Sequence, residues 1–223
     1  MNKIIPTHAE ITDFAKLTLL VYEYGKAYEV DKKTTIEEFV ANVVEKNEQD
    51  TCRMDVITEL AKSSPHGRVH KFFNNPNTDL QAGITISETH NRICVIFRGS
   101  ESKYDWYYDL AFFKTQLHND VYVHGGFHTH LHDDCMYDQI TIELKDLLMK
   151  NPDYDIYVTG HSLGAALSTL YGYELSKEIP NKITVVSFAS PRVGNTPFKN
   201  AFDSQPNLVH YRVTNKRDIV TAA

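Results

Sequence analysis

The 223-residue sequence is poor in cysteine, in basic charge and in long hydrophobic runs. Its three cysteines, Cys52, Cys94 and Cys135, are odd in number and widely spaced, unlike a zinc site or a disulfide framework. The formal net charge of −6, without a basic patch, excludes nucleic acid as the main partner. No apolar run reaches the roughly 20 residues of a transmembrane segment, and residues 1–10 lack the apolar centre of a secretory signal. We therefore expect an intracellular, cytoplasmic protein.

Glycine and proline are also sparse, at 10 and 8 residues, and neither is gathered into a linker. With 42% hydrophobic residues, the chain can bury one sizeable core. We expect a single domain over residues 1–223, with a helical segment at about 1–62. That segment contains one helix near 9–27 and a second that starts at Thr34. The C-terminal end of the domain is expected to lie beyond residue 223.

Apolar runs that resemble strands alternate with runs that resemble helices. This alternation predicts an α/β fold with a mainly parallel sheet, helices on both faces and additional N-terminal helices. Ligands of such folds bind beyond the carboxyl ends of the strands. The expected strands are residues 80–87, 92–98, 154–159, 182–189 and 207–214, and the expected later helices are 128–150 and 165–177.

Ser162 lies in the pattern Gly-x-Ser-x-Gly, together with Gly160 and Gly164. A strand-like run precedes it and a helix-like run follows, as for a nucleophilic serine exposed on a sharp strand-to-helix turn. The two glycines leave room where the helix packs back against the strand, and N–H groups at the helix start face the site. The alternative is that Ser162 only caps the helix in a glycine-rich turn.

A serine nucleophile needs a base to take its proton and an acid to orient that base. In this fold the chain order is serine, acid, histidine. Asp218 follows the last strand at the expected edge and is the favoured acid, although it could instead be a loop aspartate paired with a neighbouring cation. Glu174 and Glu178 lie more than two helical turns beyond the serine, and Asp203 precedes the last strand.

The histidine of such a triad is not in its expected place, because none follows Asp218. His210 is the only histidine after Ser162, and its position inside a strand favours a structural role. We therefore expect the triad histidine to lie beyond residue 223.

An oxyanion-binding site requires the N–H of the residue after the nucleophile, here Leu163, and a second donor from an earlier strand-to-helix loop. Phe97-Arg98-Gly99-Ser100 ends a buried strand. Gly99 permits close approach of the backbone, and Ser100 could donate from its N–H and its hydroxyl. The alternative for this segment is an ordinary polar turn.

Together these motifs resemble the fungal-type (class 3) lipase family, in order, over residues 80–220. The resemblance implies an α/β-hydrolase in which Ser162 is the nucleophile, Asp218 the acid, and Ser100 and Leu163 the oxyanion donors. The other matching segments are Trp106 with Asp109-Leu110, Val123-His124-Gly125-Gly126-Phe127, the turn with Gly160, His161 and Gly164, and residues 188–195 and 211–220.

The resemblance implies hydrolysis of a lipid ester, an acylglycerol, through an acyl-enzyme at a lipid–water interface and without a cofactor. It also implies that Trp106, Asp109 and Leu110 belong to a lid that contacts substrate. Residues 104–113 are rich in aromatic side chains, which suits a cover that presents apolar surface to lipid. A helix packed permanently on the sheet is the alternative. The disulfides of secreted members have no counterpart here.

Two other functions remain open. A non-catalytic protein that keeps the fold to bind lipid or a partner would explain why no triad histidine follows Asp218. An acyltransferase that uses an alcohol in place of water would share every residue named above.

Histidines also gather in residues 124–132. On a helix His128 and His132 would share one face, at positions i and i+4, whereas His130 would point elsewhere. The acidic Asp133 and Asp134 follow, but no His-Glu-x-x-His motif is present. We interpret this run as solvated histidines at a helix start and expect no metal.

Overall fold

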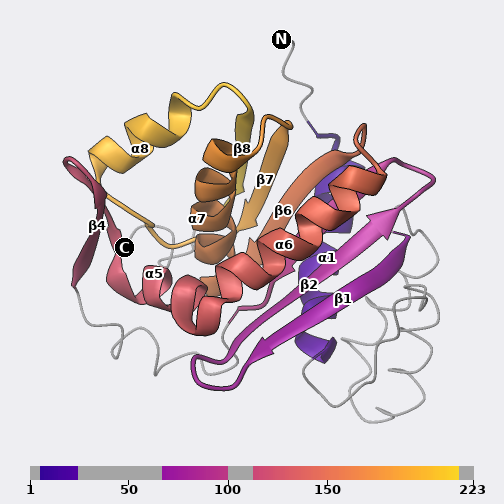
Figure 1. Ribbon diagram of the computed structural model, residues 1–223, viewed down its shortest axis with the longest axis horizontal. Helices are drawn as coiled ribbons and strands as arrows, with labels where there is room; N and C mark the ends of the chain where they lie inside the picture. Colours follow the sequence, from indigo (N-terminus) through magenta and orange to yellow (C-terminus); the bar gives the residue numbers. More distant parts are fainter. Residues whose placement is uncertain (1–5, 25–66, 100–112, 216–223) are drawn as a thin grey trace.

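The computed structural model describes residues 6–24, 67–99 and 113–215 (Figure 1). Within these ranges a six-stranded sheet has the order β1-β2-β3-β6-β7-β8. Strands β3, β6, β7 and β8 are parallel, and β2 and β1 extend the sheet in antiparallel fashion. The strands are β1 (Arg68–Asn75), β2 (Leu80–Ser87), β3 (Arg92–Phe97), β6 (Asp155–His161), β7 (Ile183–Phe188) and β8 (Leu208–Val213).

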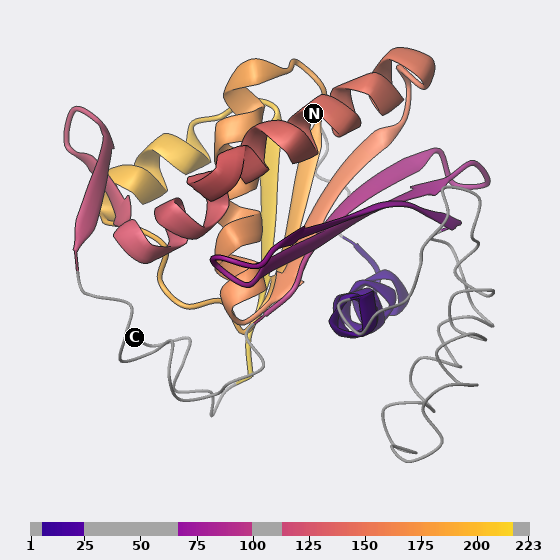
Figure 2. The same cartoon turned by 60° about the horizontal axis from the view of Figure 1, so that its bottom comes forward.

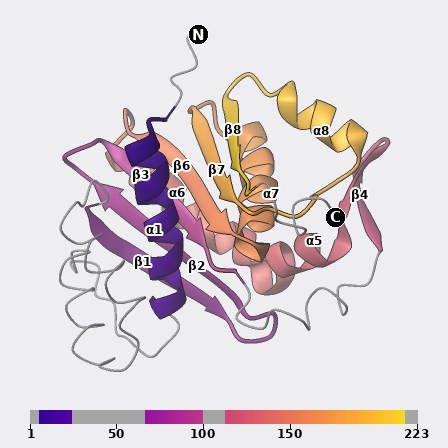
Figure 3. The same cartoon turned by 180° about the vertical axis from the view of Figure 1, so that it is seen from behind.

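Helices cover both faces of this sheet. Helix α1 (His8–Tyr24) lies on one face, opposite α6 (Met136–Lys150) and α7 (Leu163–Glu178), as Figures 2 and 3 show from two sides. Two separate hydrophobic clusters fill these layers, one beneath α1 and a larger one beneath the helices of the other face. The predicted mainly parallel sheet with helices on both faces is therefore confirmed.

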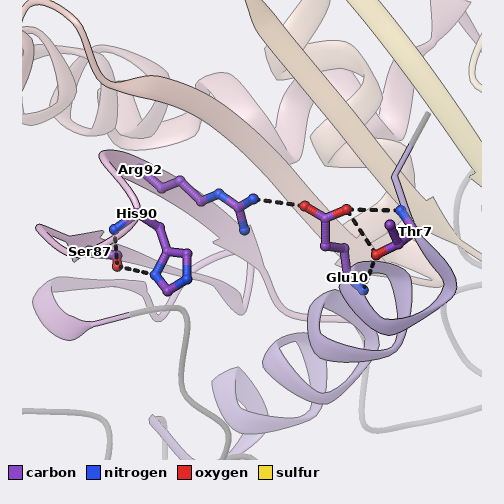
Figure 4. A network of polar contacts seen from close by, with 5 residues as sticks. All are labelled: Thr7, Glu10, Ser87, His90 and Arg92. Carbon is purple, nitrogen blue, oxygen red and sulfur yellow. Dashed lines mark hydrogen bonds and ion pairs between the residues drawn. The ribbon is translucent and has the colours of Figure 1, made fainter. Parts of the chain in front are cut away.

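The N-terminus of α1 is fixed to the sheet by polar contacts. Thr7 and Glu10 form a capping box, in which the Thr7 N–H donates to Glu10 Oε2 at 2.8 Å and the Glu10 N–H donates to Thr7 Oγ1 at 3.2 Å. The pKa of Glu10 is lowered, mainly by the hydrogen bond from the Thr7 backbone and also by the hydrogen bond and charge of Arg92. Glu10 Oε1 accepts from Arg92 of β3 at 2.8 Å (Figure 4). One carboxylate thus caps the helix and links it to the sheet.

The predicted strands 80–87 and 92–98 agree with β2 and β3 to within one residue. The turn between them contains Asn91 with φ 49°, a conformation that asparagine tolerates better than most residues. The predicted helix 128–150 is wrong as a single element. It is divided into α5 (Gly125–His132) and α6 because Asp134 and Cys135 adopt left-handed φ values of 49° and 56°.

The sequence analysis did not predict β1, the hairpin of β4 (Lys114–His118) and β5 (Val121–His124), or α8 (Thr196–Asp203). The expected second N-terminal helix lies outside the described residues. None of the helices in the described ranges combines the length and apolar character that crossing a bilayer requires.

The packing of α1 on the sheet gives a first prediction. Phe14 is 1% exposed and stacks on Tyr157 of β6, with ring centroids 4.9 Å apart. Phe14→Ala should lower the free energy of unfolding by about 3 kcal/mol, because it removes apolar contact and leaves a cavity. His8→Ala, at an exposed position of the same helix, should change it by less than about 0.5 kcal/mol. Urea unfolding of both variants measures the difference, and equal effects would contradict the packing.

Candidate active site

The carboxyl ends of the parallel strands meet at one edge of the sheet. Phe97 of β3 is in register with Gly160 of β6, His161 with Phe188 of β7, and Phe188 with Val213 of β8. The carboxyl ends of β3, β6, β7 and β8, after which the sequence analysis expected the catalytic and oxyanion residues, therefore lie side by side at this edge. The elements are close enough for the Ser162 N–H to donate to the Phe188 carbonyl at 3.0 Å.

Ser162 forms the junction between β6 and α7 in a conformation that residues other than glycine rarely adopt. Its φ is 56° and its ψ is −120°, whereas a residue that caps a helix normally has extended φ and ψ. Such conformations cost about 1–3 kcal/mol and persist only where the surroundings fix them. The side chain makes no capping hydrogen bond to α7. The alternative of a simple N-cap serine therefore does not describe Ser162, a half-buried residue whose hydroxyl does not cap the helix.

The turn around Ser162 requires glycine because backbone carbonyl groups of neighbouring segments lie where a Cβ atom would be. A Cβ on Gly164 would lie 2.2 Å from the carbonyl oxygen of Phe97, and a Cβ on Gly160 would lie 2.3 Å from that of Gly164. On the adjacent strand end, a Cβ on Gly99 would lie 2.6 Å from the carbonyl oxygen of His161. The start of α7 is therefore pressed against the ends of β3 and β6. The N–H of Leu163, the first residue of α7, has no acceptor within the helix.

Tyr22 of α1 contacts the turn around Ser162 from the face of the sheet that lies opposite α7. The sequence analysis did not identify this residue. Its hydroxyl lies 3.3 Å from Nδ1 of His161 and would also lie 2.2 Å from a Cβ on Gly99. The contact joins residues 139 positions apart, and nothing in the apolar pattern of α1 singles out this tyrosine.

Five of the predicted site residues lie outside the described residues: Ser100, Trp106, Asp109, Leu110 and Asp218. In the sequence, Ser100 directly follows Gly99, and Asp218 is three positions after Asn215. Their roles as oxyanion donor, lid residues and triad acid stay predictions.

The other acids after Ser162 have partners elsewhere. Glu174 Oε2 lies 2.9 Å from His132, Glu178 accepts from Tyr137 and Lys145, and Asp203 pairs with Lys199 at 2.6 Å. Burial acts to raise the pKa of Glu178, but the hydrogen bonds from Lys145 and Tyr137 and the charge of Lys145 together hold that pKa below its usual value. Asp218 therefore remains the acid that the chain order favours.

His210 has a structural environment on β8. Its Nε2 lies 2.8 Å from Ser187 Oγ, and its ring packs against Phe202 at 5.4 Å between centroids. Burial, assisted by the charge of Arg212 and opposed by Asp203, lowers its pKa to about 4. A cavity of about 460 Å³ beside it is lined mainly by residues 190–195 and by residues of α8 and β8, and Ser162 does not line it. We therefore do not place the reaction there.

The histidine run in residues 124–132 is more ordered than expected. His124 caps α5, with its Nδ1 accepting from the Gly126 N–H at 3.2 Å. His128 and His132 share a face of α5, as predicted, with ring centroids 4.4 Å apart. Contact with the carboxylate of Glu174 raises the pKa of His132, whereas burial and the neighbouring His132 lower that of His128. Both imidazoles are half-buried, unlike solvated histidines at a helix start.

The parallel sheet, the helices on both its faces and the constrained serine at the β6–α7 junction define an α/β-hydrolase fold. Comparison with known proteins identifies the family within this fold. The model of the family "Lipase (class 3)" matches residues 94–223, and the chain belongs to this family.

The chain is similar to phospholipase A1-II 3 of Oryza sativa subsp. indica, with 34% identity over 62% of this chain and 40% of that protein. It is 32% identical to the secreted mono- and diacylglycerol lipase A of Penicillium cyclopium, over 66% of this chain and 48% of the relative. Among solved structures, the lipase of Rhizopus microsporus var. chinensis gives a TM-score of 0.72 with 27% identity, over 98% of this chain and 70% of that one. The chain thus spans less than half the length of these two curated relatives.

The glycine contacts give a second prediction. Gly164→Ala should lower the free energy of unfolding by about 3 kcal/mol or more, because its Cβ would meet a backbone carbonyl that cannot move without the strand. Gly172→Ala, on the same helix, would meet a methyl of Val185 at 2.6 Å and gain helix propensity, so we expect a cost of about 1 kcal/mol. Chemical denaturation compares the two, and a larger cost at Gly172 would refute the tight turn.

His210 gives a third prediction. Because its pKa is about 4 in the folded state and near 6.5 in the unfolded state, the unfolded chain binds more protons between these values. The stabilisation is complete above pH 6.5 and is lost as the pH falls toward 4. From pH 7 to pH 5 we expect a loss of about 1–2 kcal/mol from this residue. His210→Gln should flatten the pH dependence of unfolding, whereas His8→Gln at an exposed site should leave it unchanged. Equal profiles for the two variants would contradict the assignment.

Proposed function

We propose that this chain carries the nucleophilic half of a serine ester hydrolase that acts on acylglycerols. The observation that supports the proposal most directly is the backbone of Ser162. A strained, half-buried serine at the junction of a strand and a helix, with its hydroxyl not used for capping, is the arrangement that α/β-hydrolases use to present a nucleophile.

In this mechanism Ser162 Oγ attacks the carbonyl carbon of the ester, and its proton passes to a histidine oriented by Asp218. The tetrahedral intermediate collapses, and the leaving alcohol departs with that proton. Water, deprotonated by the same histidine, then attacks the acyl carbon. The bond from that carbon to Ser162 Oγ breaks, the histidine returns its proton to Oγ, and the carboxylic acid is released. No cofactor takes part in either step.

Stabilisation of the oxyanion is assigned to the N–H of Leu163 and to Ser100. The N–H of Leu163 is available because it opens α7, and the helix N-terminus adds a favourable electrostatic field. Gly99 packs against the carbonyl of His161, so the described end of the chain after β3 lies beside the β6–α7 turn. This proximity supports the assignment of the second donor to Ser100, the next residue in the sequence. Removing one such donor from related sites typically costs about 10²–10³ in kcat.

The substrate class is supported by the relatives, whose names include a mono- and diacylglycerol lipase and a phospholipase A1. Both activities cleave a carboxylic ester of a glycerolipid, and the resemblance over residues 80–220 favours the acylglycerol. Trp106 and its neighbours are proposed to cover the site until lipid binds.

The test uses the protein with its complete natural sequence. Ser162→Ala should reduce hydrolysis of a diacylglycerol by about 10³-fold or more, because the members of a triad act as a unit. A fluorophosphonate probe should label Ser162 in the wild type and nothing in the variant. Ser204→Ala, at an exposed position after α8, is the control and should behave as wild type.

Three outcomes would redirect the proposal. Unlabelled wild-type protein without esterase activity would indicate a lipid- or partner-binding function. Labelling with faster hydrolysis of phosphatidylcholine than of diacylglycerol would retain the mechanism and change the substrate. Transfer of the acyl group to an added alcohol in preference to water would identify an acyltransferase.

A further inference from the structure

Three side chains from two helices bring potential ligand atoms together on the face of the sheet opposite α1. His128 and His132 come from α5, and Glu174 comes from α7. One ligand atom of each residue lies within 4.8 Å of the other two. The spacing of the histidines, at i and i+4 on a helix, is one that places two imidazoles on a single ion.

The polar atoms of this cluster are not fully used by the protein. Nε2 of His132 is buried and lies 2.9 Å from Glu174 Oε2, but without the alignment of a hydrogen bond. The second oxygen, Glu174 Oε1, is buried and accepts no hydrogen bond from the described residues. Buried polar atoms without partners are uncommon, and an unseen ion is one of the standard explanations.

The chemistry of these ligands selects the kind of ion. Two imidazole nitrogens and one carboxylate oxygen suit Zn²⁺ and related divalent transition ions, with ligand distances of about 2.0–2.2 Å. A tetrahedral ion would hold the ligand atoms about 3.3 Å apart, so side-chain rotations alone could close the observed cluster. The carboxylate of Glu174, with Asp138 nearby, makes the surroundings of His132 negative. The His132 side chain is 34% exposed, which leaves a path for entry from solvent.

We propose that His128, His132 and Glu174 bind one divalent transition-metal ion of the zinc type. Water completes its coordination. The ion joins α5 to α7 and acts as a brace between them. This site is separate from the proposed chemistry, because Glu174 lies 12 residues beyond Ser162 on α7, or about 18 Å along the helix axis. It therefore does not depend on the proposed esterase function.

The first experiment measures thermal unfolding of the protein with its complete natural sequence after removal of metal with EDTA. Addition of Zn²⁺ to about one hundred times its dissociation constant should raise Tm by about 5 °C, because the ion binds only the folded arrangement. Co²⁺ should bind in a ratio of one ion per chain and give the visible absorption of a site with low coordination number.

Variants identify the ligands. His128→Gln, His132→Gln and Glu174→Gln should each abolish the rise in Tm and the Co²⁺ absorption. His130→Gln is the matched control, because His130 is on the same helix but its Nδ1 lies 3.1 Å from the Gly126 carbonyl. This variant should respond to Zn²⁺ as wild type does.

Two results would overturn the proposal. Wild-type protein whose Tm does not change with Zn²⁺ and which gives no Co²⁺ absorption lacks the site. A Zn²⁺ effect that survives in both His128→Gln and Glu174→Gln arises from other surface groups. If a variant fails to fold, the ion count and Co²⁺ spectrum of the wild type still decide whether a specific site exists. His128→Gln, altered at a half-buried position, then tests its location.

Discussion

The structure depends on one steric constraint, the close approach of the start of α7 to the ends of β3 and β6. Gly164 lies against the carbonyl of Phe97 and Gly160 against that of Gly164, both at distances that no side chain could occupy. The chain must reverse within a single residue between them, and this reversal forces Ser162 to φ 56°. The N–H of Ser162 donates to Phe188, and its carbonyl accepts from Ala165 and Ala166, so the strained residue is held on both sides. The conformation expected of a nucleophile is thus a consequence of helix-to-sheet packing.

The rest of the fold can be understood as support for this junction. Helix α1 is tied to β3 through Glu10 and Arg92, and it carries Tyr22 to His161 beneath the turn. On the opposite face, α7 is buried along almost its whole length, so it cannot tilt to relieve the strain at Ser162. A strain of about 1–3 kcal/mol is small beside the burial of two hydrophobic layers, which is why the protein can sustain it.

The sequence predicted the parts of the structure that depend on neighbouring residues. The turn around Ser162 was predictable because its strand, glycines and helix are contiguous, and β2 and β3 because their apolar runs are continuous. Strand β1 was missed because its edge position leaves a mixed burial pattern without clear alternation. The break between α5 and α6 was missed because Asp134 and Cys135 carry no glycine or proline signal for a left-handed turn. The contact between Tyr22 and His161 and the meeting of His132 with Glu174 join distant segments, which no local pattern encodes.

Helix α7 places two polar sites at opposite ends of one rigid element. Its N-terminus, with unpaired N–H groups, favours the negative charge of an oxyanion. Toward its C-terminus Glu174 lies beside His128 and His132, the cluster proposed to bind a cation. Because about 18 Å of buried helix separates the sites, direct electrostatic coupling between them is weak. A change at His132 could reach Ser162 only by displacing α7 as a whole. The burial of that helix opposes such displacement, so we expect ion binding to change stability much more than the geometry of Ser162.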